Sequence, residues 1–124
     1  CVGPTIWRRA KVETKNISPT TAAVITRAGG KVAIITDHNI VPQHYFRIAV
    51  GVCIREGMPE EEALKAITIN AAEIIGVADR VGSLEVGKDA DLAMWSGDPF
   101  EPLTHCLLTV IDGEIVYQRC EEGK

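Results

Sequence analysis

The alternation of apolar and polar positions is interrupted at residues 32–35 (VAII), which form an unbroken apolar run. A half-buried strand alternates, so a continuous run predicts a strand buried on both faces, as in a parallel sheet. Thr36, Asp37, His38 and Asn39 follow it directly. Functional groups of α/β proteins lie at the carboxyl ends of parallel strands, so Asp37 is the leading candidate for a functional residue. The alternative is that Asp37 and Asn39 are ordinary turn or N-cap residues.

A helix is predicted before this run. Ser18 followed by Pro19 indicates a helix start, with serine as N-cap and proline at the first helical position, and Gly29 stops the helix. This helix, a glycine pair and the buried strand make the second half of a βαβ unit. Val2 is a candidate for the end of the preceding strand.

Two more helices are predicted after Pro42. Residues 44–56 suit a helix packed against the sheet, and Gly57 ends it. Pro59 and three glutamates open the next helix, since acidic residues in a first turn complement the helix dipole. Its spacing continues to Gly76, but Asn70 followed by Glu73 resembles a capping box, which predicts a break or kink there.

From Asp79 onward the chain consists of short apolar runs separated by glycines. Residues 92–95 are predicted to form a strand. Residues 107–111 and 114–118 flank Asp112-Gly113, a dipeptide that favours a two-residue type I′ hairpin. This tail is therefore expected to be rich in β-structure.

The stretch from Thr5 to Asn16 has no clean period and is expected to be an exposed loop. Its basic residues Arg8, Arg9 and Lys11 could hold an anionic group of a substrate. The alternative is an ordinary solvated charged loop.

Composition narrows the class of protein. The chain has 124 residues, 46% of them hydrophobic and 24% charged, with a net charge of -4, as in soluble globular domains. We expect no nucleic-acid partner, because there is no basic cluster. We expect no membrane partner, because no apolar run approaches the roughly 20 residues that span a bilayer.

The four cysteines form no CxxC pair and no disulfide framework, which indicates a reduced, cytoplasmic protein.

Four motifs follow one another in a specific order: Asn70-Ala71-Ala72-Glu73, residues 81–92 (VGSLEVGKDADL), Gly97-Asp98-Pro99 and Ile111-Asp112-Gly113. Their order and spacing resemble the end of the metal-dependent amidohydrolase superfamily, and more closely its imidazolonepropionase-like branch. Members of that superfamily have a (β/α)8 barrel carrying one or two divalent metals. A small β-sandwich is built from segments at both chain ends.

The resemblance implies an α/β protein. Residues 1–78 would form the carboxyl-terminal part of the barrel, its last one or two strands with their helices, and residues 79–124 a β-rich segment of the composite sandwich. Asp37 would end the last barrel strand, bind metal and act as general acid/base, taking a proton from the attacking water and passing it to the leaving nitrogen. His38 is assigned a substrate-binding role and no ligand role, because neighbouring strand-end residues point in different directions.

The resemblance also implies a parent enzyme that hydrolyses a C–N bond in a cyclic or linear small-molecule amide with a divalent metal, zinc being the expected ion. A barrel takes about 250 residues, and the family's other metal-binding histidines lie upstream of Cys1. The chain is therefore expected to be a fragment that is inactive alone and binds no metal, and neither His44 nor His105 matches a metal-site spacing. The alternative is a non-catalytic folding or association fragment.

A homo-oligomer, most simply a dimer, is expected on the same resemblance. The strand beginning near Val32 and the strands of the tail would both lack their usual pairing partners. Open strand edges are templates for pairing with another chain, and a two-fold axis can cover them in both copies at once.

Overall fold

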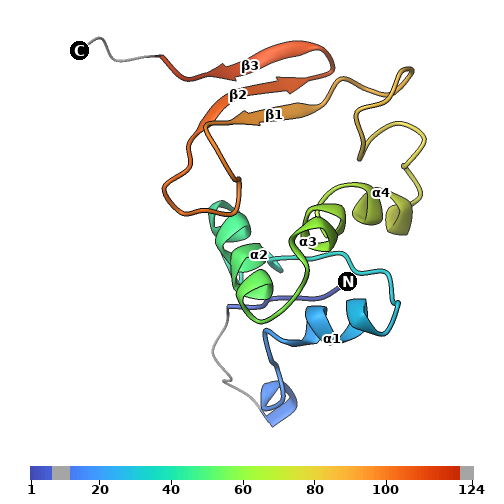
Figure 1. Ribbon diagram of the computed structural model, residues 1–124, viewed down its shortest axis with the longest axis vertical. Coiled ribbons are helices and arrows are strands. Elements are labelled where there is room, and N and C mark those ends of the chain that lie inside the picture. The colour runs from blue at the N-terminus through green and yellow to red at the C-terminus, as the bar shows by residue number, and fades with distance from the viewer. Residues whose placement is uncertain (7–11, 121–124) are drawn as a thin grey trace.

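The structure is a computed structural model, and it describes residues 1–6 and 12–120. Figure 1 shows the helices gathered around the amino-terminal segment and a small sheet at the opposite end of the molecule. The elements in chain order are the 3-10 turn η1 (Val12–Thr14), α1 (Thr21–Arg27), the 3-10 turn η2 (Gln43–Tyr45), α2 (Phe46–Arg55), α3 (Glu60–Ala66), α4 (Ile69–Ile75), β1 (Leu92–Trp95), β2 (Cys106–Ile111) and β3 (Glu114–Gln118).

The apolar run lies in the core and pairs in parallel with the amino terminus. Val2 and Ile34 form a parallel bridge, in which the Val2 N–H donates to the Ala33 carbonyl at 2.7 Å and the Ile35 N–H donates to the Val2 carbonyl at 2.9 Å. Parallel pairing of the run with Val2 is thereby confirmed, as a single bridge and not as a longer strand. Val32, Ala33 and Ile34 are each 3% exposed or less.

Ile35 is an exception to the predicted burial. It is 39% exposed, so the expectation of a run buried on both faces is wrong at this residue. Ile34 belongs to the core cluster with Val50, Cys53 and Met58. Successive side chains of an extended segment point to opposite sides, so Ile35 points away from that cluster.

Two of the predicted helix boundaries shift. The regular part of α1 begins at Thr21 and not at Pro19. Ser18 still caps the preceding turn, because its Oγ accepts a hydrogen bond from the Thr20 N–H at 3.3 Å and its carbonyl accepts one from the Thr21 N–H at 3.1 Å. The predicted helix at residues 44–56 is present as η2 followed by α2.

The capping box predicted at Asn70 is wrong. The break between α3 and α4 falls at Ile67 and Thr68, and Asn70 lies within α4. Its side chain has a partner outside the helix, since Asn70 Nδ2 donates to the Val32 carbonyl at 3.3 Å. Tertiary contact with the apolar run therefore replaces the local cap that the sequence indicated.

The tail forms a three-stranded antiparallel sheet in the order β1-β2-β3. Asp112 and Gly113 have φ values of 51° and 78°, both in the left-handed region that a type I′ turn requires, so the predicted hairpin is confirmed. Both pairings contain an irregularity, between Met94 and Trp95 and between Thr109 and Val110. In the part of the chain that the structure describes, the outer edges of β1 and β3 pair with no other strand.

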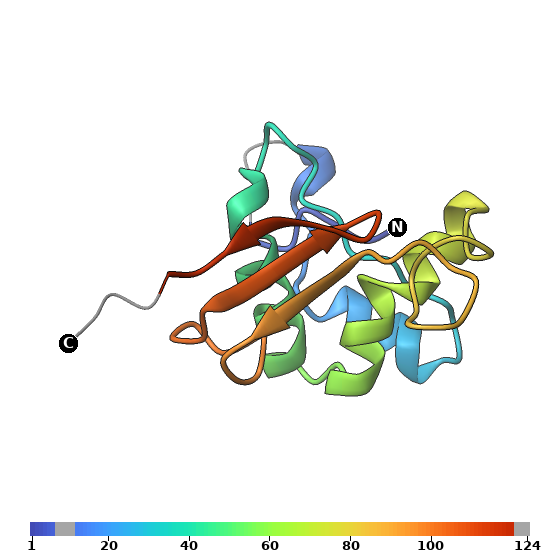
Figure 2. The same cartoon turned by 90° about the horizontal axis from the view of Figure 1, so that it is seen from above.

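Residues 95–104 attach the sheet to α2, and Figure 2 shows the sheet lying over α2 and α3. The guanidinium group of Arg47 donates to the carbonyls of Pro99 and Thr104 and lies over the Trp95 ring. Phe100 packs against the helical core. Arg47 therefore ties the tail to α2, the helix that follows the Asp37 turn.

Candidate functional site

Asp37 lies where the chain leaves the core. Thr36 is 9% exposed and Asp37 is exposed, and Val41 returns to the interior at 4% exposure. The Asp37 carbonyl accepts a hydrogen bond from the Ile40 N–H at 2.6 Å. The Asp37 φ of 54° is in the left-handed region, which aspartate and asparagine adopt more readily than most residues. The turn that carries Asp37 is thus anchored at both ends.

Asp37 and His38 line one hollow of about 370 Å³, to which Ile34, Ile35, Thr36, Gln43 and Phe46 also contribute. Gln43 comes from η2 and Phe46 begins α2, so the hollow lies between the end of the apolar run and the helix that follows. A carboxylate, an imidazole and an amide beside apolar walls can bind a small polar molecule and transfer a proton to or from it.

The structure therefore brings together the two residues predicted from the sequence, and it adds Gln43 and Phe46. Sequence reasoning missed these two, because both fall in a stretch whose helical pattern marks them only as residues near a helix start. Their spacing of six and nine residues after Asp37 carries no motif. The path of the chain through Val41 is what brings Gln43 and Phe46 to the hollow that Asp37 lines.

The described residues do not by themselves form a metal site. Within residues 1–6 and 12–120, no three His, Cys, Asp or Glu side chains converge. His44 lies against Tyr45, with ring centroids 4.2 Å apart, and His105 precedes β2. A protein metal site needs three or four ligands, so any metal at Asp37 requires ligands from elsewhere.

The loop from Thr5 to Asn16 is described only at its ends. Thr5 is 7% exposed and its hydroxyl donates to the Ala49 carbonyl at 3.2 Å, so the expectation of an exposed loop is wrong at that end. Arg8, Arg9 and Lys11, the candidates for holding an anionic group, lie outside the described residues.

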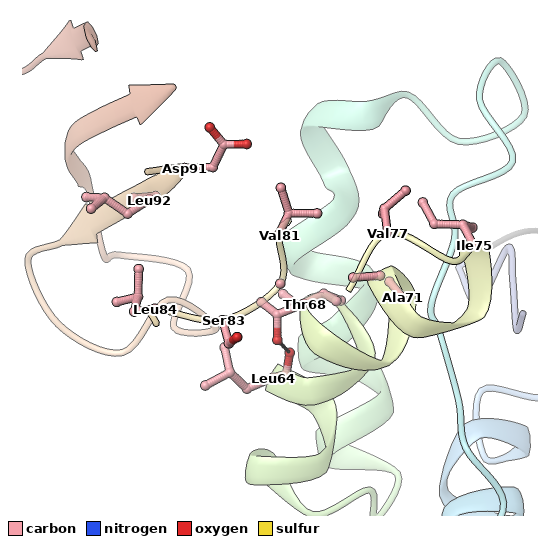
Figure 3. A pocket seen from close by; sticks show the side chains of 14 residues that line it. Leu64, Thr68, Ala71, Ile75, Val77, Val81, Ser83, Leu84, Asp91 and Leu92 are labelled. Atoms are coloured by element: carbon pink, nitrogen blue, oxygen red, sulfur yellow. Dashed lines mark hydrogen bonds between the residues drawn. The ribbon is translucent and has the colours of Figure 1, made fainter. Parts of the chain in front are cut away.

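A second hollow, of about 670 Å³, lies between α3, α4 and β1. Figure 3 shows Val81 between Asp91 on one side and Ala71 and Val77 on the other. Its walls are mainly aliphatic, and the Asp91 carboxylate accepts a hydrogen bond from the Asp112 N–H at 2.8 Å. Among the described residues, this hollow has no imidazole in its lining, whereas the hollow at Asp37 has both a carboxylate and an imidazole, so Asp37 stays the leading candidate.

Among the described residues, none of the helices has both the length and the apolar character needed to cross a bilayer.

The chain belongs to the amidohydrolase family, whose model matches residues 12–118. It is 33% identical over 102 residues to an imidazolonepropionase of Sphingopyxis alaskensis, covering 79% of this chain and 24% of that protein. A crystal structure of an amidohydrolase from Thermotoga maritima MSB8 superposes with a TM-score of 0.91 at 39% identity, over 95% of this chain and 31% of that one.

A Xaa-Pro dipeptidase with methionine bound in its active site is also similar, with a TM-score of 0.70 at 25% identity, over 86% of this chain and 28% of that one. The chain thus spans only about a quarter to a third of the length of these relatives. The resemblance inferred from the four motifs is confirmed by these matches.

Proposed function

We propose that this chain supplies the carboxyl-terminal portion of a metal-dependent hydrolase that cleaves a C–N bond in a small-molecule amide. The observation that carries the proposal is the place of Asp37. It follows a buried segment paired in parallel with Val2, and it faces a hollow shared with His38 and Gln43. Membership of the amidohydrolase family supports our assigning to this carboxylate the exchange of protons with the reacting molecule.

Within this hollow, each residue has a distinct role. Asp37 accepts a proton from the attacking water and returns it to the leaving nitrogen, which needs a carboxylate within hydrogen-bond reach of both atoms. His38 and Gln43 hold polar groups of the substrate, and Phe46 contributes an apolar wall. A divalent metal, zinc in our proposal, supplies Lewis acidity when bound. Its other ligands come from outside the described residues.

The division of the chain follows the same proposal. Residues 1–78 contribute the last strands and helices of a (β/α)8 barrel, and residues 79–124 contribute strands to a composite β-sandwich. The parallel Val2–Ile34 bridge with α1 between its two partners supports the first assignment. The antiparallel sheet β1-β2-β3 supports the second.

The substrate we favour is a cyclic amide, because the imidazolonepropionase of Sphingopyxis alaskensis is similar over 79% of this chain. The dipeptidase likeness makes a linear amide the second candidate. Turnover by the polypeptide translated from the complete reading frame distinguishes the two. We expect hydrolysis of an imidazolone ring in preference to Xaa-Pro dipeptides, and hydrolysis of neither class would contradict the proposal.

A second candidate function is a folding or association unit without a complete site. It is favoured by one observation, that no three potential metal ligands converge among the described residues. Zinc analysis of the purified 124-residue chain tests it, because stoichiometric, tightly bound zinc would contradict it. We propose a cytoplasmic location for either function.

Self-association also remains a proposal, although the structure revises its basis. The strand edge expected to be open near Val32 is partly covered within the chain, by Asn70 at the Val32 carbonyl and by the Ala66 carbonyl at the Ile34 N–H. The unpaired outer edges of β1 and β3 are what remains to support a dimer. Sedimentation equilibrium at micromolar concentration tests it, since a single species of 13.4 kDa would contradict it.

A further inference from the structure

The motif Asn70-Ala71-Ala72-Glu73 has no role in the hollow at Asp37, yet it contacts the segment that leads there. We propose that Asn70 is a positioning residue, which holds residues 32–36 in register against α4 and thereby fixes the turn that carries Asp37. The catalytic meaning of this inference rests on the proposed function, whereas the structural tie itself does not.

The two edges of the apolar run are bonded to different parts of the chain. Along one edge, the Ala33 carbonyl and the Ile35 N–H bond to Val2. Along the other edge, the Val32 carbonyl accepts from Asn70 Nδ2 at 3.3 Å and the Ile34 N–H donates to the Ala66 carbonyl at 3.2 Å. The run is therefore held between the amino terminus and the α3–α4 connection.

Asn70 is the side chain that specifies this second edge. The Ala66 carbonyl is a backbone group at the end of α3, so it accepts from whichever N–H is presented to it. The donor to the Val32 carbonyl, in contrast, exists only because residue 70 is asparagine. In an extended segment, a slip of one residue turns every side chain to the opposite face. Such a slip would take Ile34 out of the core and would turn Asp37 away from its hollow.

The rest of the motif is consistent with this role. Ala72 is 4% exposed, and a small residue there lets α4 lie close to its neighbours. Glu73 forms an ion pair with Lys31, the residue just before the run. Both partners of that pair are substantially exposed, at 51% and 40%, so the pair contributes little alone. The half-buried Asn70 bond is the stronger constraint.

The covered edge ends before the functional turn. Among the described residues, neither the Ile34 carbonyl nor the Thr36 N–H has a hydrogen-bond partner. Asn70 and Ala66 thus constrain the first half of the run and leave its last residues without support on that side. For this reason the position of Asp37 depends on the hydrogen bond from Asn70 to the carbonyl of Val32, five residues before it.

Amide hydrogen exchange of the 124-residue chain, measured by NMR, tests the inference without any assay of turnover. Asn70→Asp keeps the shape of the side chain and removes the donor. We expect the Ile34 amide to exchange at least tenfold faster, and the Ile40 amide, which bonds to the Asp37 carbonyl, to exchange faster as well. The amides of Val50 and Cys53 in α2 should be unchanged.

Two comparisons separate the hydrogen bond from general packing. Lowering the pH below about 4 protonates a carboxyl group, which restores an O–H donor. At that pH, the Ile34 amide of Asn70→Asp should regain protection from exchange relative to the unsubstituted 124-residue chain at the same pH. Asn70→Leu, of similar size and with no donor, should lose protection at every pH. Gln118→Glu adds the same charge at an exposed position of β3. It should change the exchange rate of neither the Ile34 amide nor the Ile40 amide.

Each result decides the matter. Unchanged protection of Ile34 in Asn70→Asp would overturn the inference, and so would an equal loss throughout α2, since Asn70 would then support the whole core. In the polypeptide from the complete reading frame, we expect Asn70→Asp to lower kcat at least tenfold with KM within about twofold. Faster exchange at Ile34 with unchanged kcat would overturn the positioning role and leave the proposed hydrolysis intact. Absence of turnover in the unsubstituted polypeptide from the complete reading frame would contradict the proposed function alone.

Discussion

Arg47 of α2 lies over the indole ring of Trp95 on β1, with its guanidinium carbon 4.5 Å from the ring centroid. The same guanidinium donates hydrogen bonds to the carbonyls of Pro99 and Thr104. A cation over an aromatic face contributes about 0.5–2 kcal/mol, and hydrogen bonds from a charged donor are stronger than those from neutral ones. One side chain therefore joins the helical part of the chain to its tail.

We predict that Arg47→Ala lowers the free energy of unfolding by about 2 kcal/mol. Arg47→Lys should recover less than half of this loss, because an ammonium group lacks the planar fork that reaches two carbonyls while stacking on a ring. Urea denaturation measures both. The control is Arg55→Ala in the same helix, whose partner Glu56 is its neighbour. A loss equal to that of the control would show that the contacts of Arg47 contribute nothing to stability.

The second prediction compares two neighbouring isoleucines of the apolar run. Ile34 is 3% exposed and Ile35 is 39% exposed. Burying an unpaired carboxylate costs several kcal/mol, and small domains are stable by only about 5–15 kcal/mol. Ile34→Asp should therefore prevent folding, whereas Ile35→Asp should give a folded chain. Circular dichroism and thermal melts distinguish them, and a cooperative, unshifted melt of Ile34→Asp would contradict the burial.

The third prediction concerns Cys53, which is fully buried. Burial raises the pKa of its thiol. A raised pKa in the folded state means that the unfolded chain releases the proton first. The contribution of Cys53 to stability is thus complete below the unfolded pKa of about 8.5. It is lost as the pH rises toward the folded value.

We therefore expect the Tm to fall more steeply above about pH 8.5 in the parent chain than in Cys53→Ala. The substitution itself should lower the Tm at pH 7, because it leaves a small cavity. Thiol labelling gives an independent check: the exposed Cys1 and Cys120 should react before Cys53 does. Equal pH slopes together with rapid labelling of Cys53 would show that the thiol is accessible.

The fourth prediction is that the 124-residue chain alone hydrolyses no amide, with or without added zinc. Among the described residues no three potential ligands converge, and a metal bound by fewer than three protein ligands is weakly held. A sensitive assay for released amine or ammonia on cyclic and linear amides is suitable. Turnover that disappears with Asp37→Asn would contradict this expectation.

Local chemistry made parts of the fold predictable from the sequence. The Asp112-Gly113 turn needs two residues that accept a positive φ, so its position and type could be predicted. The strand at Leu92–Trp95 and the helix preceded by Pro59 and its glutamates are likewise set by residues within a few positions. Asp37 could be singled out as a candidate because a buried run ends directly before it.

Features that depend on distant contacts were not predictable in this way. The Asn70–Glu73 spacing has the form of a local cap, but Asn70 bonds instead to Val32, 38 residues away. The exposure of Ile35 depends on which side of the run the helices cover. Gln43 and Phe46 join the hollow at Asp37 only because of the path that the chain takes after Val41. Periodicity carries no information on any of these.

The central claim is that Asp37 transfers protons in amide hydrolysis, and the kcat of Asp37→Asn in the polypeptide from the complete reading frame tests it most directly. Asparagine accepts the left-handed backbone of this turn, so the fold should persist, while proton transfer typically contributes about 10²–10⁴-fold. We predict a loss of at least a hundredfold in kcat, with Asp79→Asn, an exposed carboxylate, unchanged. Retention of more than about a tenth of the parent rate by Asp37→Asn would contradict the assignment.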